Sequence, residues 1–318
     1  MSIYSTLRRK FINATRHKVI GVPAAIVAKT IGREEISRKI SVMCEFVPQW
    51  TPVYPPGHDD APFFMNGVDG TEPVARSLWW GGWNGFEAPM PSMFAALSAR
   101  PGIILDIGAF SGFYSLVAAR IRNTAAIVAF EPFPNARQIL KSNIDRNGLN
   151  TVITVAPIAL SDHVGVSKLA VPTTSTGLLE SASSIEPTYY DNVLATHEVE
   201  TNTLDGFMQE RNLDPVSLIK LDVEGHEAAV LDGASGVFRN DRPVLFMEIL
   251  TTTDCLPFQI FFDKNNYANA VLYPGGLMWR RSIQSEGNNT NHLLCPSEHK
   301  EEIMRLAEQI GLENTNAD

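Results

Sequence analysis

A cluster of carboxylates and one imidazole follows an apolar segment in the second half of the chain. The stretch Lys220-Leu221-Asp222-Val223-Glu224-Gly225-His226-Glu227 holds three carboxylates and one histidine within six residues. Such groups are the usual general acids and bases of enzymes. Because Asp222, Glu224 and His226 alternate, an extended backbone would present them on one face, while Glu227 would stabilise the start of the next helix. We therefore predict a catalytic site here, against the alternative that Asp222 and His226 only form hydrogen bonds at a helix start.

A glycine-containing turn follows an earlier apolar run. Its sequence is Asp106-Ile107-Gly108-Ala109-Phe110-Ser111-Gly112. Glycine lets the backbone turn sharply and approach a ligand, and the amides of a following helix point at the same space. Phe110 stands where the dinucleotide pattern G-x-G-x-x-G has its middle glycine. That side chain would crowd out a pyrophosphate, whereas a nucleoside without phosphates would still fit.

Two further polar pairs follow later apolar runs. Glu131-Pro132 comes 19 residues after Gly112, the usual place for a carboxylate that binds ribose hydroxyls. Ser161 and Asp162 are candidates for binding an adenine amino group. The alternatives are an exposed glutamate at a strand end by chance and a commonplace Ser-Asp turn.

The elements that position these residues alternate between strands and helices from residue 102 onward. We expect helices over 114–121, 134–147, 227–231 and from Ser297, and a hairpin at 166–171 and 198–201. We expect sheet strands at 103–107, 126–130, 152–155, 218–221, 244–249, 270–273 and 293–295. Alternating strands and helices are typical of an α/β, doubly wound, mostly parallel sheet, here of seven strands with helices on both faces. Such sheets bind ligands at the carboxyl ends of their strands, where Glu248 is expected to lie beside Asp222.

Residues 47–91 are rich in proline, glycine and aromatic residues, a composition that favours irregular structure. The aromatic stretch 79–86 within it is predicted to be a hydrophobic plug, and the alternative is a lid that stacks on substrate. We divide the chain into a basic extension with this wrap (1–85), a main domain (86–297) and a C-terminal helix and tail (298–318).

The composition of the 318 residues is that of an ordinary globular protein, with 44% hydrophobic and 19% charged residues. The three cysteines form no CxxC pair, so reduced thiols and a cytoplasmic location are expected. No apolar run reaches the roughly 18–20 residues that a membrane-spanning helix needs. The net charge is −9, but residues 1–39 carry +7, so the remainder carries −16. An acidic main body makes nucleic acid an unfavourable principal partner, whereas the basic segment, with Ile3, Leu7 and Phe11 at helical spacing, is suited to weak contact with a membrane surface or a partner protein.

The stretch from Phe86-Glu87 to Ile249 resembles the FkbM family of S-adenosylmethionine-dependent methyltransferases. The matching segments are LDIGAFSGFYSL, FEPFPNARQILKSNIDRNGL, IALSD, TNTLDGF, LIKLDVEGHEAAVLDGA and RPVLFMEI. The resemblance implies a class I methyltransferase (Rossmann-like) fold with a terminal antiparallel strand. It also implies S-adenosyl-L-methionine as cofactor, and mostly O-methylation of small metabolites or sugars.

The resemblance also implies roles for particular residues. Asp106, Gly108 and Gly112 would cradle the methionine part of the cofactor, Glu131 would bind its ribose and Asp162 its adenine. Asp222 would face the methyl-transfer centre. The full set of predicted cofactor contacts is Glu87, Asp106, Gly108, Ala109, Gly112, Glu131, Pro132, Ser161, Asp162 and Asp222.

Methyl transfer to an alcohol needs a group that accepts the hydroxyl proton. Asp222 and His226 are the candidates, and Glu224 would orient the imidazole. A divalent cation held by Asp222 and Glu224 is an alternative. We predict no metal, because adjacent aspartates or an Asp-Asn pair are missing. Two other classes stay open at this point: a nicotinamide-dependent oxidoreductase and a non-catalytic binding protein on the same fold.

Overall fold

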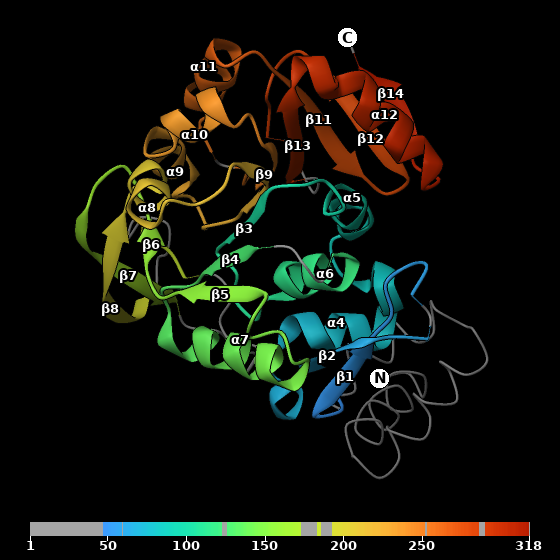
Figure 1. Cartoon of the computed structure of the whole chain (residues 1–318), viewed down its shortest axis with the longest axis vertical. Helices are drawn as coiled ribbons and strands as arrows, with labels where there is room; N and C mark the ends of the chain where they lie inside the picture. The colour runs from blue at the N-terminus through green and yellow to red at the C-terminus, as the bar shows by residue number, and fades with distance from the viewer. Residues whose placement is uncertain are drawn as a thin grey trace, which may run out of the picture. The chain divides into compact units, whose positions relative to one another are not determined.

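Figure 1 shows the computed structural model of the chain, which describes residues 47–58, 60–122, 126–172, 183–185, 193–251, 253–285 and 290–317. The basic segment with its predicted helix, Cys44, and most of the irregular region 172–197 lie outside the described residues. Two compact units divide the chain. One comprises residues 1–87 and 176–179, and the other comprises residues 88–175 and 180–318.

The first unit contains regular structure where we predicted an irregular wrap. Strand β1 (Trp50–Val53) pairs antiparallel with β2 (Phe63–Asn66), and helix α4 (Pro73–Gly81) follows. The prediction was wrong because it treated proline as a breaker. Pro73 instead stands at the start of α4, where the missing N–H has no helical partner to lose. The Glu72 carboxylate accepts a hydrogen bond from Ala75 N and caps the same helix.

The second unit is built on one large sheet, and the predicted α/β class is confirmed. Among the described residues the sheet has nine strands, two more than the seven predicted, and the two additional strands come from the C-terminal part of the chain. In spatial order they are β5 (Ile153–Ala156), β4 (Ile127–Phe130), β3 (Ile103–Ile107), β9 (Val216–Leu221), β10 (Val244–Glu248), β13 (Asn291–Pro296), β11 (Tyr267–Tyr273), β12 (Gly276–Arg280) and β14 (Glu313–Asn316).

The strands from β5 to β10 are parallel, and β13 lies antiparallel between β10 and β11. That insertion is the terminal antiparallel strand that the family resemblance implies. The two additional strands follow from local causes. A tight turn at Gly275, with φ of 112°, returns the chain from β11 into β12, and β14 then pairs with β12 after the terminal helix.

Helices cover both faces of this sheet (Figure 1). On one face lie α5 (Met90–Leu97), α6 (Phe113–Ile121) and α7 (Pro134–Arg146), and on the other α8 (Leu204–Arg211), α9 (Glu227–Asp232), α10 (Ser235–Asn240) and α11 (Leu256–Lys264). The terminal helix is α12 (Lys300–Gln309). Among the described helices, none combines the length and the apolar character that crossing a lipid bilayer requires.

The core on the α8–α11 face joins alternate strand residues to these helices. Leu105, Ile219 and Leu245 of three neighbouring strands pack in it with Phe207 and Phe238. A separate small sheet consists of β6 (Ala159–Leu160), β8 (Val193–Asn202) and β7 (Gly165–Pro172). Its antiparallel strands β7 and β8 form the predicted hairpin. The candidate site lies at the carboxyl ends of β3, β4 and β9, which are parallel strands of the large sheet.

Candidate functional site

The glycine turn after β3 and the acidic loop after β9 are in direct backbone contact. Asp222 N donates a hydrogen bond to Ile107 O at 3.1 Å. Gly108 has φ of 79°, and a Cβ built on it would stand 1.8 Å from the carbonyl oxygen of Asp222. No larger residue fits there, so glycine is needed at position 108 for this close approach as well as for its backbone angle. The two predicted parts of the site therefore meet at one edge of the sheet.

The amides of the glycine turn are directed toward the end of β4. Gly108 N and Ala109 N both donate to Phe130 O, at 3.1 and 3.0 Å. Phe110 N donates to Glu131 Oε2 at 2.7 Å. These three amides are occupied by the protein itself, so they do not form the open anion-binding loop that a pyrophosphate requires.

Asp106 is buried at the base of the turn, with 1% of its surface exposed. Its Oδ2 accepts hydrogen bonds from Ser115 N at 3.0 Å and Ser115 Oγ at 2.7 Å, so it is fixed to the first turn of α6. Its Oδ1 is buried and has no hydrogen-bond partner among the described residues. Burial raises the pKa of this carboxyl. An unsatisfied buried oxygen costs about 1–3 kcal/mol, so a donor group on a bound ligand fits this position.

Glu131 joins the glycine turn to the start of α7. Its Oε2 accepts from Phe110 N, and its Oε1 accepts from Phe133 N at 2.8 Å. The residue is 6% exposed, and burial raises the pKa of its carboxyl to about 7 despite these hydrogen bonds. Each carboxylate oxygen can accept a second hydrogen bond, so the geometry leaves capacity for ribose hydroxyls. The carbonyl of neighbouring Pro132 accepts from Arg137 Nη1 at 2.8 Å.

Ser161 connects the loop after β6 to His226. Its Oγ lies 3.0 Å from Asp162 Oδ1 and 3.0 Å from His226 Nε2. Ser161 is fully buried, and His226 is 7% exposed. Asp162 is exposed, and the hydrogen bond from His163 lowers the pKa of its carboxyl. The His226 imidazole thus supports, through Ser161, the loop that was predicted to bind adenine.

The acidic loop is not extended, so that part of the prediction was wrong. Glu224 and Gly225 have φ of 54° and 96°, and the chain turns sharply between Asp222 and α9. Glu227 is the first residue of α9, as predicted, and its carboxylate accepts from Val223 N at 2.9 Å and from Gly225 N at 3.1 Å. It therefore fastens the turn that precedes α9, and burial raises the pKa of this carboxyl to about 7.

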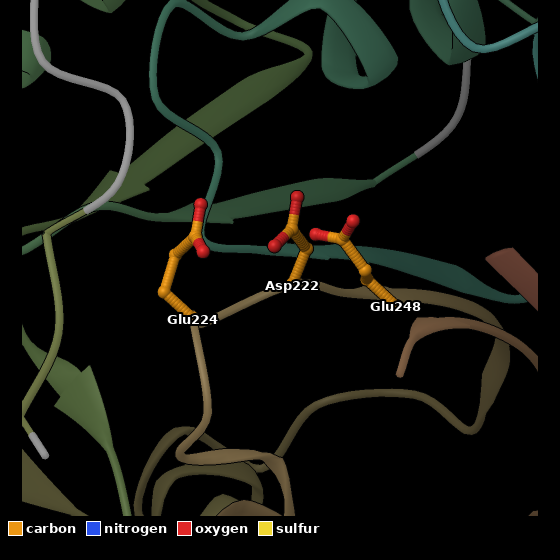
Figure 2. A group of neighbouring side chains, drawn as sticks. All are labelled: Asp222, Glu224 and Glu248. Atoms are coloured by element: carbon orange, nitrogen blue, oxygen red, sulfur yellow. The ribbon is translucent and has the colours of Figure 1, made fainter. Parts of the chain in front are cut away.

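Three carboxylates converge at the ends of β9 and β10. Figure 2 shows Asp222, Glu224 and Glu248 directed toward the same space, and one oxygen of each lies within 4.8 Å of the others. This arrangement includes Glu248, as expected, and its Oε1 accepts from Thr290 Oγ1 at 2.9 Å. Burial, followed by the negative charges of Asp222 and Glu248, raises the pKa of Glu224 to about 9. The three oxygens have the spacing that a divalent cation would accept.

Lys220 is the residue of this site that sequence reasoning missed. It lies near the end of β9, is 6% exposed, and its Nζ is 2.9 Å from Asp222 Oδ2 and 3.3 Å from the carbonyl oxygen of Gly108. The available signal was a single lysine within the otherwise mostly apolar segment Val216–Leu221. A charge at a buried strand position requires a partner, and the aspartate two residues later is on the same face.

Glu87 is the one predicted cofactor contact that belongs to the first unit. It has φ of 45° and is the last residue of that unit's main segment. Its part in the site stays a prediction.

Comparison with known proteins supports the family suggested by these residues. The model of the methyltransferase FkbM domain matches residues 106–266. This chain belongs to the FkbM methyltransferase family. The matched region of this FkbM protein contains every predicted site residue except Glu87.

Several solved methyltransferase structures align with part of this chain at low sequence identity. The FkbM methyltransferase of Methylobacillus flagellatus is 15% identical with a TM-score of 0.42, and the match covers 61% of this chain and 43% of that chain. The precorrin-6y C5,15-methyltransferase of Geobacter metallireducens is 15% identical with a TM-score of 0.35, covering 64% and 85%. The O-methyltransferase of Bacillus cereus in complex with SAH is 16% identical with a TM-score of 0.37, covering 65% and 80%. No curated protein matches this chain.

Proposed function

We propose that this protein uses S-adenosyl-L-methionine to methylate a hydroxyl group of a small metabolite, sugar or glycan. Membership of the FkbM family supports methyl transfer. The observation that carries the proposal is the backbone contact between Gly108 and Asp222. A nucleoside cofactor held by the glycine turn would therefore lie beside the loop that bears the carboxylates.

The chain offers a separate group for each part of such a cofactor. We assign Asp106, Gly108, Ala109 and Gly112 to its methionine part, Glu131 and Pro132 to its ribose, and Ser161 and Asp162 to its adenine. Two observations support this assignment: Asp106 Oδ1 has no hydrogen-bond partner among the residues that the structure describes, and Glu131 has remaining acceptor capacity. The occupied amides of residues 108–110 count against a dinucleotide at the same turn.

S-adenosyl-L-methionine, when bound, supplies a methyl group on a positively charged sulfur. The protein must align the accepting oxygen with that group, and alignment of this kind contributes on the order of 7–11 kcal/mol. A base that takes the hydroxyl proton adds roughly 10²–10⁴-fold.

Asp222 is our first candidate for that base. Lys220 holds its Oδ2 at 2.9 Å, while its Oδ1 has no hydrogen-bond partner among the described residues. His226 is the second candidate, but its Nε2 lies 3.0 Å from Ser161 Oγ. A hydroxyl is favoured over a base amine as acceptor because Asp222-Val223-Glu224-Gly225 stands where amine methyltransferases carry Asn/Asp-Pro-Pro-Tyr.

Calorimetry with S-adenosylhomocysteine and, separately, with NAD tests the cofactor. We expect heat only from the first compound, and binding of NAD alone would favour an oxidoreductase. Incubation of cell extract with the protein and a labelled methyl donor, read by mass spectrometry, then identifies the acceptor as a methylated product. Binding without any methylated product would favour a non-catalytic protein.

Variants of the two candidate bases test the chemistry. We expect Asp222→Asn to lower kcat by roughly 10²-fold or more, with or without chelator. Full turnover in both Asp222→Asn and His226→Ala proteins would remove these residues from the mechanism.

A further inference from the structure

A lysine ammonium is buried within the parallel sheet of the second unit. Lys220 is 6% exposed and lies between β3 and β10, where its register partners are Asp106 and Phe246. An ammonium without compensation is unfavourable in such a place. The groups that contact the ammonium must therefore compensate its charge.

The ammonium contacts both loops of the candidate site. It lies 2.9 Å from Asp222 Oδ2, 3.3 Å from Gly108 O and 5.7 Å from the centre of the Tyr114 ring. It thus bridges the glycine turn and the acidic loop, which already touch through Gly108 and the Asp222 carbonyl. Its distance to the Asp222 oxygen is that of a strong, charge-assisted hydrogen bond.

The same ammonium acts on a second carboxylate of the cluster, that of Glu224. Its positive charge lowers the pKa of Glu224, in opposition to burial and to the negative charges of Asp222 and Glu248. Clusters of this type often hold a divalent cation through their oxygens. Here the chain supplies a cation of its own, which would repel a second one.

We propose that the Lys220 ammonium is the resident cation of the Asp222–Glu224–Glu248 cluster, where it orients Asp222 and excludes divalent metal ions. Lys220 is then a positioning residue, because it acts through Asp222. The inference rests on the proposed function only for the role that it gives Asp222 in catalysis. Its electrostatic part is tested without any methyl acceptor.

The test is a titration with Mn²⁺ followed by electron paramagnetic resonance of the free ion. We expect wild-type protein and Lys220→Arg, which keeps the charge, to bind Mn²⁺ weakly or not at all. Lys220→Met should have a dissociation constant for Mn²⁺ at least about tenfold lower than that of the wild type. Adding Glu248→Gln to Lys220→Met should abolish this gain, because it removes one of the three carboxylates.

Matched controls separate this effect from general changes. Lys264→Met removes an exposed lysine of α11 and should leave Mn²⁺ binding as in the wild type. Wild-type melting with MgCl₂ and with NaCl at equal ionic strength gives a readout that needs no variant, and we expect equal melting temperatures.

Tight Mn²⁺ binding by the wild type, equal affinity in the wild type and Lys220→Met, or a melting temperature raised specifically by Mg²⁺ would each overturn the proposal. Calorimetry with S-adenosylhomocysteine on the same samples reports on the proposed function separately. If that compound fails to bind while only Lys220→Met takes up Mn²⁺, the function is wrong and the role of Lys220 as resident cation stands.

Discussion

The backbone of Gly108 lies against the carbonyl oxygen of Asp222, with no room for even one methyl group between them. These two residues follow neighbouring parallel strands, β3 and β9. The glycine turn, to which we assign the cofactor, and the acidic loop therefore touch through their backbones. Changes at either position should therefore affect both cofactor binding and catalysis.

Gly108→Ala should unfold the turn or displace the acidic loop. The added Cβ would stand 1.8 Å from a backbone oxygen, which a rigid sheet edge cannot absorb. We expect a loss of stability of about 2–4 kcal/mol and no measurable binding of S-adenosylhomocysteine, as read by thermal melting and calorimetry. Gly148→Ala is the matched control, because Gly148 also has a left-handed φ of 68° but no atom of the described residues lies within 4 Å of its Cβ position. A wild-type affinity in Gly108→Ala would contradict the close contact.

Binding of S-adenosylhomocysteine should strengthen as pH rises toward 7. Burial raises the pKa of Glu131 to about 7, and only the ionised carboxylate offers its full acceptor capacity to ribose hydroxyls. Ligand binding then releases a proton below this pH. The dissociation constant should rise by up to about tenfold per pH unit below pH 7 and level off above it.

Calorimetry from about pH 6 to about pH 8.5 measures this dependence on both sides of the raised pKa of Glu131. Glu131→Gln should bind more weakly and lose the dependence, since its amide group would oppose the N–H of Phe110 or Phe133. Asp162→Asn, at an exposed position, should keep the wild-type slope. A pH-independent wild-type affinity would argue against ribose binding by Glu131.

His226→Ala should weaken cofactor binding more than it slows the chemical step. The imidazole lies 3.0 Å from Ser161 Oγ, which also contacts Asp162 in the predicted adenine loop. Loss of one such hydrogen bond corresponds to about 0.5–1.5 kcal/mol, or roughly two- to tenfold in the dissociation constant for S-adenosylhomocysteine. If instead the dissociation constant is unchanged and kcat falls by roughly 10²–10⁴-fold, His226 is the base and our preference for Asp222 is wrong.

Glu224→Gln should stabilise the protein at alkaline pH. The pKa of Glu224 is raised to about 9 by burial and nearby negative charge, so its protonated form favours folding at low pH and this contribution is lost as pH rises from about 4.5 to about 9. The amide variant cannot ionise. Its melting temperature should exceed that of the wild type by a few degrees at pH values near 9, and the difference should shrink toward pH 5. Glu301→Gln, at an exposed position of α12, should show no such trend.

The sequence predicted the sheet well where apolar runs are short and bounded. The strand predicted at 103–107 matches β3, and the hairpin and the antiparallel strand also occur where expected. Strand β14 could not be found in this way, because its residues Glu313–Asn316 are all polar and show no alternation of apolar and polar side chains. Proline misled the interpretation of residues 47–91, since Pro73 begins a helix.

Sequence reasoning named the three carboxylates of the candidate site, but it missed Lys220 and the pairing of the side chains. Asp222, Glu224 and Glu248 converge as expected. The contact between Ser161 and His226 joins residues 65 positions apart, and no local pattern encodes it. The left-handed backbone of Glu224 is equally invisible, because only the surrounding fold stabilises that conformation in a glutamate.

The interlocked backbones at Gly108 and Asp222 also bear on protein engineering. Libraries that seek new methyl acceptors should leave these two positions unchanged and vary side chains whose replacement does not shift the main chain. Selections that randomise the whole acidic loop would mostly recover variants that no longer bind the proposed methyl donor or the original acceptor.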